Sequence, residues 1–147
     1  MSAGTDQRVH TASVFAAVSS VHLPQVVWYL RAQSVSCAEV DTVVGVFDPS
    51  ASDKSKYGLT RVSLHSLSNG TQVLKVTGRP QEVSTRSCLV RSLVSSQVKG
   101  KATAFLQYLD YGLVFHYRIK GKEFMLSPNL CCRVLQLYKV IWLRVWV

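Results

Sequence analysis

Apolar and polar residues alternate over much of this chain, which is typical of strands that bury one face. The alternation is clearest over residues 39–47, 59–67 and 71–78. Asn69-Gly70 separates the second and third of these runs, and this dipeptide favours the type I′ turn of a hairpin because both turn positions need positive φ. The pattern therefore predicts three strands, the last two joined by a tight hairpin.

Alternation gives way to helical spacing and then returns within residues 88–126. Residues 88–95 are predicted as a strand, residues 99–109 as an amphipathic helix and residues 113–119 as another strand. The apolar face predicted for the helix consists of Ala102, Phe105, Tyr108 and Leu109.

Glycines mark the predicted ends of these elements. Gly100 precedes the helix, and Gly112 follows it near the C′ position, where glycine is enriched. Lys120-Gly121 interrupts the alternation and predicts a turn into a last strand at residues 122–126. We therefore expect residues 89–126 to form a strand, a helix and a hairpin, all short and amphipathic.

The N-terminal third is less regular. Residues 1–11 are polar and are predicted to be disordered, whereas residues 11–30 fit either a helix kinked near Pro24 or a strand followed by a helix. Residues 48–58 and 79–87 have the composition of loops. These patterns predict a disordered segment at 1–11, a single domain at 12–140 and an apolar tail at 141–147.

The composition suits one domain with a sizeable core, because 48% of the 147 residues are hydrophobic. Lys and Arg number 17 against 8 Asp and Glu, so the formal net charge is +9. Such a balance suits nucleic acid, an anionic membrane surface or an acidic protein, or simply a solvated basic face. The bases are scattered and form no run typical of a nucleic-acid-binding tail.

Two apolar segments could be mistaken for membrane signals. Residues 14–30 contain His22 and Pro24 and fall short of the roughly 20 apolar residues of a spanning helix. Residues 134–147 are too short and too charged for that role. The N-terminus has neither the charged region nor the cleavage site of a signal peptide, so the nucleus or the cytosol is expected.

Four cysteines, Cys37, Cys88, Cys131 and Cys132, show no regular spacing. Cys131 and Cys132 would point to opposite sides of a strand and are therefore not expected to bridge each other. Free, mostly buried thiols in a reducing compartment are the expectation.

No arrangement of residues in the sequence indicates a catalytic centre. The four histidines, His10, His22, His65 and His116, have no cysteine at zinc-ligand spacing. The glutamates are only Glu39, Glu82 and Glu123, widely separated, whereas a metal-dependent phosphohydrolase built in a β-barrel needs clustered carboxylates. Asp110 fits the end of a helix or a turn. We expect no catalytic, metal or cofactor-binding residues, and the partner-binding residues are not identifiable.

A small RNA-binding β-domain is the alternative. Phe115 and Tyr117 could stack bases while Arg118, Lys120 and Lys122 contact phosphates. The two aromatic residues also fall where an inward-facing core pair would fall, and the core interpretation is preferred. An unusual metal-dependent phosphohydrolase is a third, weaker possibility.

The order of motifs along the chain resembles subunit 18 of the Mediator complex. Residues 26–34 are similar to that family's early helix, and the hairpin at Asn69-Gly70 to its early strands. The resemblance covers residues 26–136. The matching positions are Gly78, Pro80, Leu89, Val90, Arg91, Phe105, Leu106, Tyr111, Gly112, Lys120, Gly121 and Phe124.

The resemblance implies an α+β, mainly β fold: an antiparallel, partly open β-barrel with one or two helices packed on it. It also implies a non-enzymatic role without cofactors, in the nucleus, within the head module of Mediator. Members of the family dock on a helix from subunit 8, pair with subunit 20 and help to link regulators to RNA polymerase II. Their barrel is similar to that of RNA triphosphatases, whose metal site requires the carboxylates missing from this pattern.

The C-terminal residues depart from the family. Its members continue after this region with further strands and a C-terminal helix, which residues 137–147 do not resemble. We therefore expect a truncated or alternatively spliced form, or a mispredicted gene model, in which the barrel is incomplete at its C-terminal end. An open barrel leaves strand edges uncovered, so this form is expected to be less stable than a complete one.

Overall fold

The computed structural model describes residues 7–50, 60–78 and 89–142. They form seven strands and two helices. The elements are β1 (Gln7–Ser13), α1 (Leu23–Gln33), β2 (Ser36–Pro49), β3 (Val62–Leu67), β4 (Gln72–Thr77), β5 (Leu89–Val98), α3 (Ala102–Tyr108), β6 (Tyr111–Ser127) and β7 (Leu130–Trp142).

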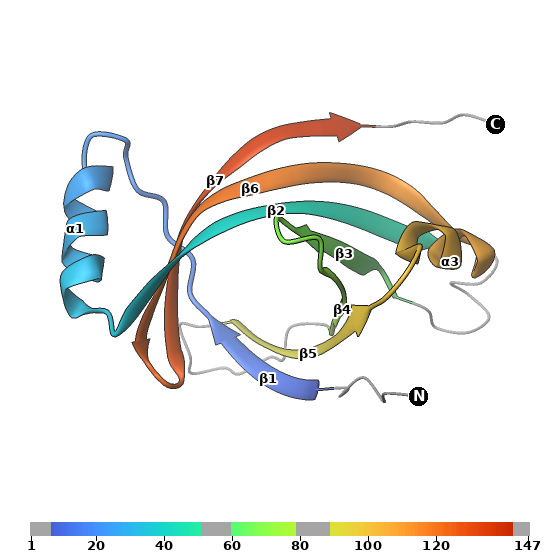
Figure 1. Ribbon diagram of the computed structural model, residues 1–147, viewed down its shortest axis with the longest axis horizontal. Coiled ribbons are helices and arrows are strands. Elements are labelled where there is room, and N and C mark those ends of the chain that lie inside the picture. Colours follow the sequence, from blue (N-terminus) through green and yellow to red (C-terminus); the bar gives the residue numbers. More distant parts are fainter. Residues whose placement is uncertain (1–6, 51–59, 79–88, 143–147) are drawn as a thin grey trace.

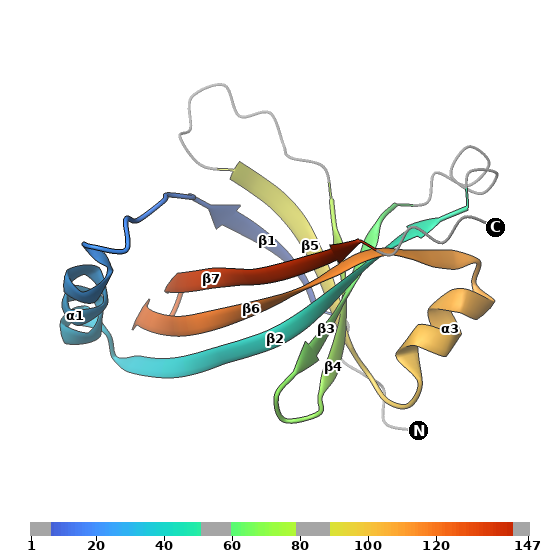
Figure 2. The same cartoon turned by 90° about the horizontal axis from the view of Figure 1, so that it is seen from above.

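All seven strands belong to one antiparallel sheet in the order β1-β5-β4-β3-β2-β6-β7. The sheet curls so that β5 and β1 face back toward β6 and β7, but the described strands do not close into a barrel (Figure 1; Figure 2). Helix α1 lies at one end of the long strands and α3 at the other. The predicted α+β, mainly β, partly open barrel with helices packed on it is therefore confirmed.

One face of the sheet packs against α3. Phe47 of β2 pairs with Val62 of β3, and both are buried beneath the helix with Leu64. Ala102 and Leu106 of α3, four residues apart, supply the helical side of this core. We call this side of the sheet the convex face, because the sheet bends away from α3 (Figure 2).

The opposite, concave face is also buried in its centre. Thr42, Val44 and Val46 alternate with the residues that face α3, and Val44 is only 1% exposed. No helix is needed above them, because the curl of the sheet brings the flanking strands over its own centre. The core thus has two parts, one beneath α3 and one within the curl.

The predicted hairpin between β3 and β4 is confirmed, but its predicted type I′ turn is wrong. The Gly70 N–H donates to the Leu67 carbonyl (3.0 Å), and Gly70 has φ +83°, whereas Asn69 does not have positive φ. This geometry matches a type I turn followed by a bulged glycine. The Asn69 side chain accepts a hydrogen bond from the Thr71 N–H (2.9 Å), which favours the longer loop.

The turn predicted at Lys120-Gly121 is also wrong. Strand β6 continues through both residues to Ser127, and the chain reverses at Pro128 and Asn129. Gly121 is required for another reason: a Cβ placed there would lie 2.0 Å from the Val134 carbonyl oxygen. The glycine therefore permits a close approach of the β6 and β7 backbones.

Helix α3 lies within the predicted range, but its predicted apolar face is only partly right. Ala102 is buried, whereas Tyr108 is 88% exposed and Phe105 and Leu109 are also largely exposed. Leu106 takes the buried position instead. Asp110, with φ 61°, ends the helix in the left-handed conformation, and Gly112 already belongs to β6. The helix-ending role expected of Asp110 is confirmed, and the C′ role expected of Gly112 is not.

At the N-terminus, the strand-then-helix alternative is the one observed. Residues 7–11, predicted to be disordered, form most of β1 and pair with β5. Their polarity is compatible with an edge strand, since backbone hydrogen bonds hold it in place. Pro24 stands in the first turn of α1, where its missing N–H costs nothing.

Several other boundaries differ from the prediction. Residues 48 and 49 of the first predicted loop belong to β2, and residues 141 and 142 of the predicted tail belong to β7. The remaining loop residues at 51–58 and 79–87, and the rest of the tail, lie outside the described residues.

Replacing Gly121 with alanine should destabilise the fold, because the new methyl group would collide with the backbone of β7. We expect Gly121→Ala to lower the free energy of unfolding by about 1–3 kcal/mol, measured by urea denaturation. Gly112→Ala is the matched control, since a Cβ at Gly112 meets nothing within 4 Å. Equal effects of the two substitutions would contradict the close approach of β6 and β7.

Candidate protein-docking surfaces

Ionisable side chains from four strands converge on the concave face. Register places His65 of β3, Lys75 of β4, Glu123 of β6 and Arg133 of β7 on this side of the sheet. The charge of Arg133 influences both His65 and Lys75, although two strands separate β3 from β7 in the sheet. The curl of the sheet therefore brings these groups into one cluster, which we call the concave cluster.

His65 is the most perturbed member of the concave cluster. Burial, with the charges of Lys75 and Arg133, lowers its pKa from 6.5 to about 4, so the imidazole is neutral at physiological pH. Its Nε2 lies 3.0 Å from the Ser63 hydroxyl oxygen, within hydrogen-bonding distance. The neutral ring is thus accommodated by a polar neighbour rather than by a carboxylate.

Lys75 is half-buried and has no ion pair with any described residue. Burial, followed by the charge of Arg133, lowers its pKa, and the nearby Glu123 opposes this shift only in part. Glu123 itself is engaged by Arg133, whose Nε donates to its carboxylate. The concave cluster therefore contains two cations and one carboxylate, and Lys75 is the uncompensated charge.

Aromatic and aliphatic side chains continue the concave face toward β7. Phe115 and Tyr117 stack there with ring centroids 6.1 Å apart, opposite Val46 and Val44 of β2. Burial raises the pKa of the Tyr117 hydroxyl. These two residues occupy the inward-facing positions expected of a core pair, although both remain half exposed.

The convex face of β2 and β6 carries a ladder of ion pairs. Arg118 donates two hydrogen bonds to Asp41, at 2.8 and 2.7 Å, and the bonded guanidinium lowers the pKa of the Asp41 carboxyl. Lys122 pairs with Glu39 at 2.6 Å. Lys120 lies 3.9 Å from Asp41 and 5.7 Å from the centre of the Tyr138 ring.

This arrangement bears on the RNA-binding alternative. Phe115 and Tyr117 lie on the concave face, whereas Arg118, Lys120 and Lys122 lie on the convex face. A stacked base and its own phosphate cannot reach both sides of one sheet. All three bases also already form ion pairs with carboxylates, so the geometry disfavours the combined stacking and phosphate-binding site.

Helix α1 and the residues on either side of it expose several large apolar side chains. Trp28 is 72% exposed, and no residue of the helix is buried. Pro24, Gln25, Trp28 and Tyr29 line a shallow hollow of about 520 Å³. We call this region the α1 surface, and the other exposed large apolar residues in it are Val14, Phe15, Val18, Val21, Leu23 and Val35.

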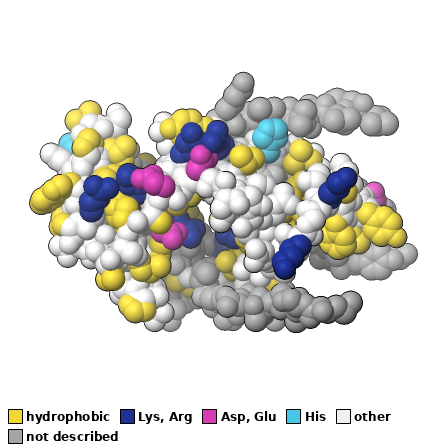
Figure 3. Space-filling view, viewed as in Figure 1, with side chains coloured by type: hydrophobic (Ala, Val, Ile, Leu, Met, Phe, Trp, Pro, Cys, Tyr) yellow, Lys and Arg dark blue, Asp and Glu magenta, His cyan; other side chains and the backbone are white. Residues whose placement is uncertain are grey.

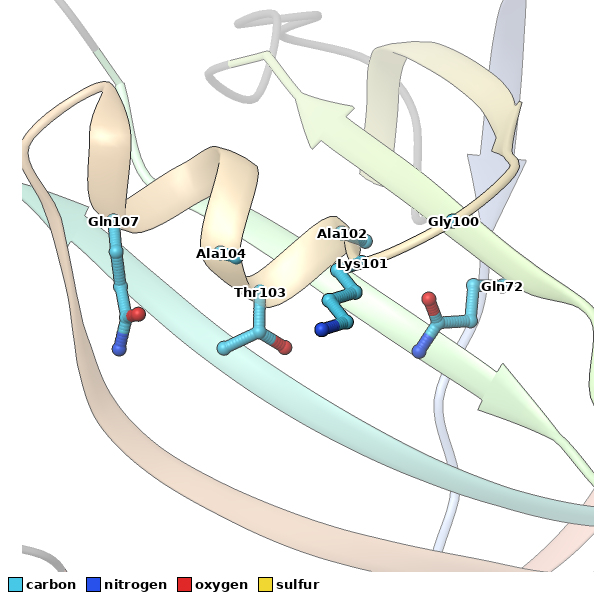
Figure 4. Close-up of a pocket in the computed structure, with 7 residues that line it drawn as sticks. All are labelled: Gln72, Gly100, Lys101, Ala102, Thr103, Ala104 and Gln107. Carbon is cyan, nitrogen blue, oxygen red and sulfur yellow. The ribbon is translucent and has the colours of Figure 1, made fainter.

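A second hollow, of about 450 Å³, lies beside α3 and is more polar. Lys101, Thr103 and Gln107 of the helix region point into it with Gln72 of β4 (Figure 4). The space-filling view shows apolar side chains exposed at both the α1 end and the α3 end of the molecule, with charged side chains of both signs near the middle (Figure 3).

The residues considered as candidate catalytic or metal-binding groups do not form a cluster. Glu39 lies on the convex face and Glu123 on the concave face, each in an ion pair, while Glu82 lies outside the described residues. Within residues 7–50, 60–78 and 89–142, no three His, Cys, Asp or Glu side chains are placed to hold a metal ion. No helix in this part of the chain is long and apolar enough to cross a membrane.

The expectation of mostly buried cysteines is wrong for the thiols that are described. Cys37 and Cys131 are exposed and Cys132 is half-buried, and all three are free. Cys131 pairs with Met125 and Cys132 with Phe124, so the two neighbours point to opposite faces as expected. Their strand lies at the edge of the sheet, which leaves its side chains open to solvent.

The concave cluster and the α1 surface were missed by sequence reasoning. His65 and Lys75 lie on the same face as each other by simple alternation, which the sequence does contain. Their convergence with Arg133 depends on the curl of the sheet and has no local signal. The α1 surface had a signal, since Trp28 and Tyr29 are adjacent and cannot both face the sheet.

The neutral state of His65 predicts a pH-dependent stability. Because the folded-state pKa lies below that of the unfolded chain, the unfolded state binds more protons between about pH 6.5 and pH 4. The free energy of unfolding should fall as the pH is lowered through this window. His65→Gln should weaken that dependence, as measured by urea denaturation at pH 7 and pH 4.5. An equal effect of His116→Gln, on the convex face, would exclude His65 as the cause.

Comparisons with known proteins agree with this architecture. The family model of the Med18 protein matches residues 10–142. A chain in the solved structure of the Schizosaccharomyces pombe Mediator head module is similar in fold, with a TM-score of 0.70 and 17% sequence identity. The similarity covers 88% of the present chain and 67% of that chain. No curated protein sequence matches. Because the family model spans most of the sequence, the chain belongs to the Med18 family.

Proposed function

We propose that this protein is a non-enzymatic subunit of the Mediator coactivator, acting in the nucleus in the regulation of transcription by RNA polymerase II. The observation that carries the proposal is the family match over residues 10–142. The fold shared with a chain of the Mediator head module supports the same assignment. Its partners would be other head subunits, with a helix of subunit 8 and with subunit 20 as the specific candidates.

A docking role agrees with how the described surface is arranged. The α1 surface exposes several large apolar side chains close together in the sequence, and exposed apolar patches mark interaction sites. Trp28 and Tyr29 are of the types enriched at the energetic centres of interfaces. Helix α1 has only 11 residues and no buried side chain, so it would gain stability from a partner packed against it.

The two described glutamates support a non-enzymatic role. Each forms an ion pair with a base, and the sheet separates them. Metal-assisted phosphoryl transfer in a barrel would need carboxylates that share one face and one ion. The protein would therefore use a barrel scaffold for docking rather than for chemistry.

Affinity purification of the tagged chain from nuclear extract, with mass spectrometry, tests the proposal. Mediator head subunits, including subunits 8 and 20, should be recovered with the unmodified chain. Trp28→Asp should reduce that recovery at least about tenfold, because it places a charge in the apolar α1 surface. Tyr108→Asp is the control, since Tyr108 is exposed on α3 at the opposite end. Absence of every head subunit from the unmodified sample would reject the proposed function. Full recovery with Trp28→Asp would reject only the role of the α1 surface.

Salt dependence separates protein docking from the RNA-binding alternative. Binding to phosphates should weaken steeply between 50 and 200 mM salt, whereas an apolar interface should change little. We expect a fluorescent single-stranded RNA to show no saturable binding at either concentration, as measured by anisotropy. Tight binding that is lost at the higher concentration would favour the RNA-binding function instead.

A further inference from the structure

The turn between β3 and β4 places an exposed asparagine, Asn69, directly before an exposed glycine, Gly70. The side-chain amide carbon of an asparagine lies within reach of the backbone nitrogen of the next residue, and a glycine there has no side chain to hinder the approach. A Cβ placed at Gly70 would meet nothing within 4 Å, so the space beside this residue is also open. The Asn69 amide is therefore placed where it can react with its own backbone.

Three hydrogen bonds close this turn. The Gly70 N–H donates to the Leu67 carbonyl oxygen (3.0 Å), and the Leu67 N–H donates to the Thr71 carbonyl oxygen (2.9 Å). The Thr71 N–H donates to Oδ1 of Asn69 (2.9 Å), which draws electron density from the amide carbon. The first of these bonds shields the Gly70 N–H proton from solvent. The closed turn thus polarises the amide carbon but withholds the nitrogen that would attack it.

We propose that Asn69 is a site of spontaneous deamidation and that the β3–β4 turn slows the reaction until the hairpin opens. The products are aspartate and isoaspartate at this position. Both reacting groups belong to adjacent residues, so the site needs no other segment of the chain and no partner. This inference does not rest on the proposed function.

The reaction consumes only water. The Gly70 nitrogen loses its proton and forms a bond to the side-chain carbonyl carbon of Asn69. The bond from that carbon to the side-chain nitrogen breaks, and ammonia leaves with the proton. Water then opens the resulting cyclic imide at either of its two carbonyl carbons, which gives aspartate or isoaspartate. No group is oxidised or reduced, and a neutral amide becomes a carboxylate.

Packing away from the turn controls how readily the hairpin opens. Leu64 of β3 pairs with Leu74 of β4, and both pack in the core beneath α3. The register of the hairpin runs from the turn to this core, so the packing resists separation of the two strands. A reaction that needs a local opening is slowed by the free energy of that opening. The rate of deamidation at Asn69 therefore reports the local stability of the hairpin.

The two products differ in what they preserve of the turn. An aspartate carboxylate can still accept the hydrogen bond from the Thr71 N–H. Isoaspartate directs the main chain through the side-chain carbon and adds one methylene to the backbone between Leu67 and Thr71. This changes the spacing of the hydrogen bonds that close the turn. Either product also lowers the formal net charge of +9 by one unit.

The chain has one other asparagine, Asn129, which provides an internal control. It lies in the exposed turn between β6 and β7 but precedes Leu130 rather than a glycine. The purified 147-residue chain is incubated at neutral pH in buffer and in urea and sampled over time. Trypsin releases residues 62–75 with one asparagine and residues 123–133 with the other. Chromatography with mass spectrometry then measures the amide, aspartate and isoaspartate forms of each fragment.

In urea, Asn69 should deamidate at least about tenfold faster than Asn129, because glycine leaves the attacking nitrogen unhindered. In buffer, Asn69 should deamidate at least about tenfold more slowly than in urea, because the hairpin must open first. Leu64→Ala should raise the rate in buffer by weakening the core and leave the rate in urea unchanged. Leu109→Ala, at a largely exposed position, is the matched control and should alter neither rate.

The inference is overturned if Asn69 reacts no faster than Asn129 in urea, because the dipeptide would then have no special reactivity. Equal rates at Asn69 in buffer and in urea would show that the turn does not slow the reaction. An unchanged rate in buffer for a folded Leu64→Ala variant would likewise reject control by hairpin opening. If circular dichroism shows that this variant is unfolded, the comparison of buffer with urea for the unmodified chain decides the matter.

Discussion

The pairing of β2 with β6 is the interaction on which the rest of the structure depends. Every residue of β2, from Ser36 to Pro49, has a partner in β6, with one register shift between Val46 and Phe47. The two long strands bend together, and the sheet curls around them (Figure 1). Twist accumulates across such a sheet, and a bulge increases it locally. The curl buries Thr42, Val44 and Val46 while α3 covers the other face.

The sequence predicted the strands and their faces because alternation is a local property. Val62 and Leu64 are buried beneath α3 as their spacing indicates. The turn expected at Lys120-Gly121 failed because local turn preference is weaker than a register maintained along all of β2. Gly121 is instead required by the close approach of the β7 backbone, which lies more than ten residues further along the chain. Packing also decides which residues of the seven-residue helix α3 are buried. It buries Leu106 rather than Phe105.

The fold also places charged residues that are scattered in the sequence on two separate faces of the sheet. On the convex face, Asp41 and Glu39 neutralise Arg118 and Lys122, so exposed bases there are partly compensated. On the concave face, Glu123 is paired with Arg133, and Lys75 forms no ion pair with a carboxylate among the described residues. A formal charge of +9 therefore does not act as a uniform field. Among the described residues inside the curl, the half-buried Lys75 is the charge with the least compensation. A count of charged residues could not have identified it.

The same alternation explains why this barrel scaffold suits docking better than metal chemistry. Glu39 opposes Lys122, and the next residue of β6, Glu123, necessarily points to the other face. A register shift of one residue would be needed to bring both carboxylates to one side, and it would expose Val44 and Val46 at the same time. The packing that stabilises the curl therefore also keeps the two glutamates apart. Among the described residues, what the fold leaves exposed beside this scaffold is the apolar α1 surface, with Trp28 and Tyr29.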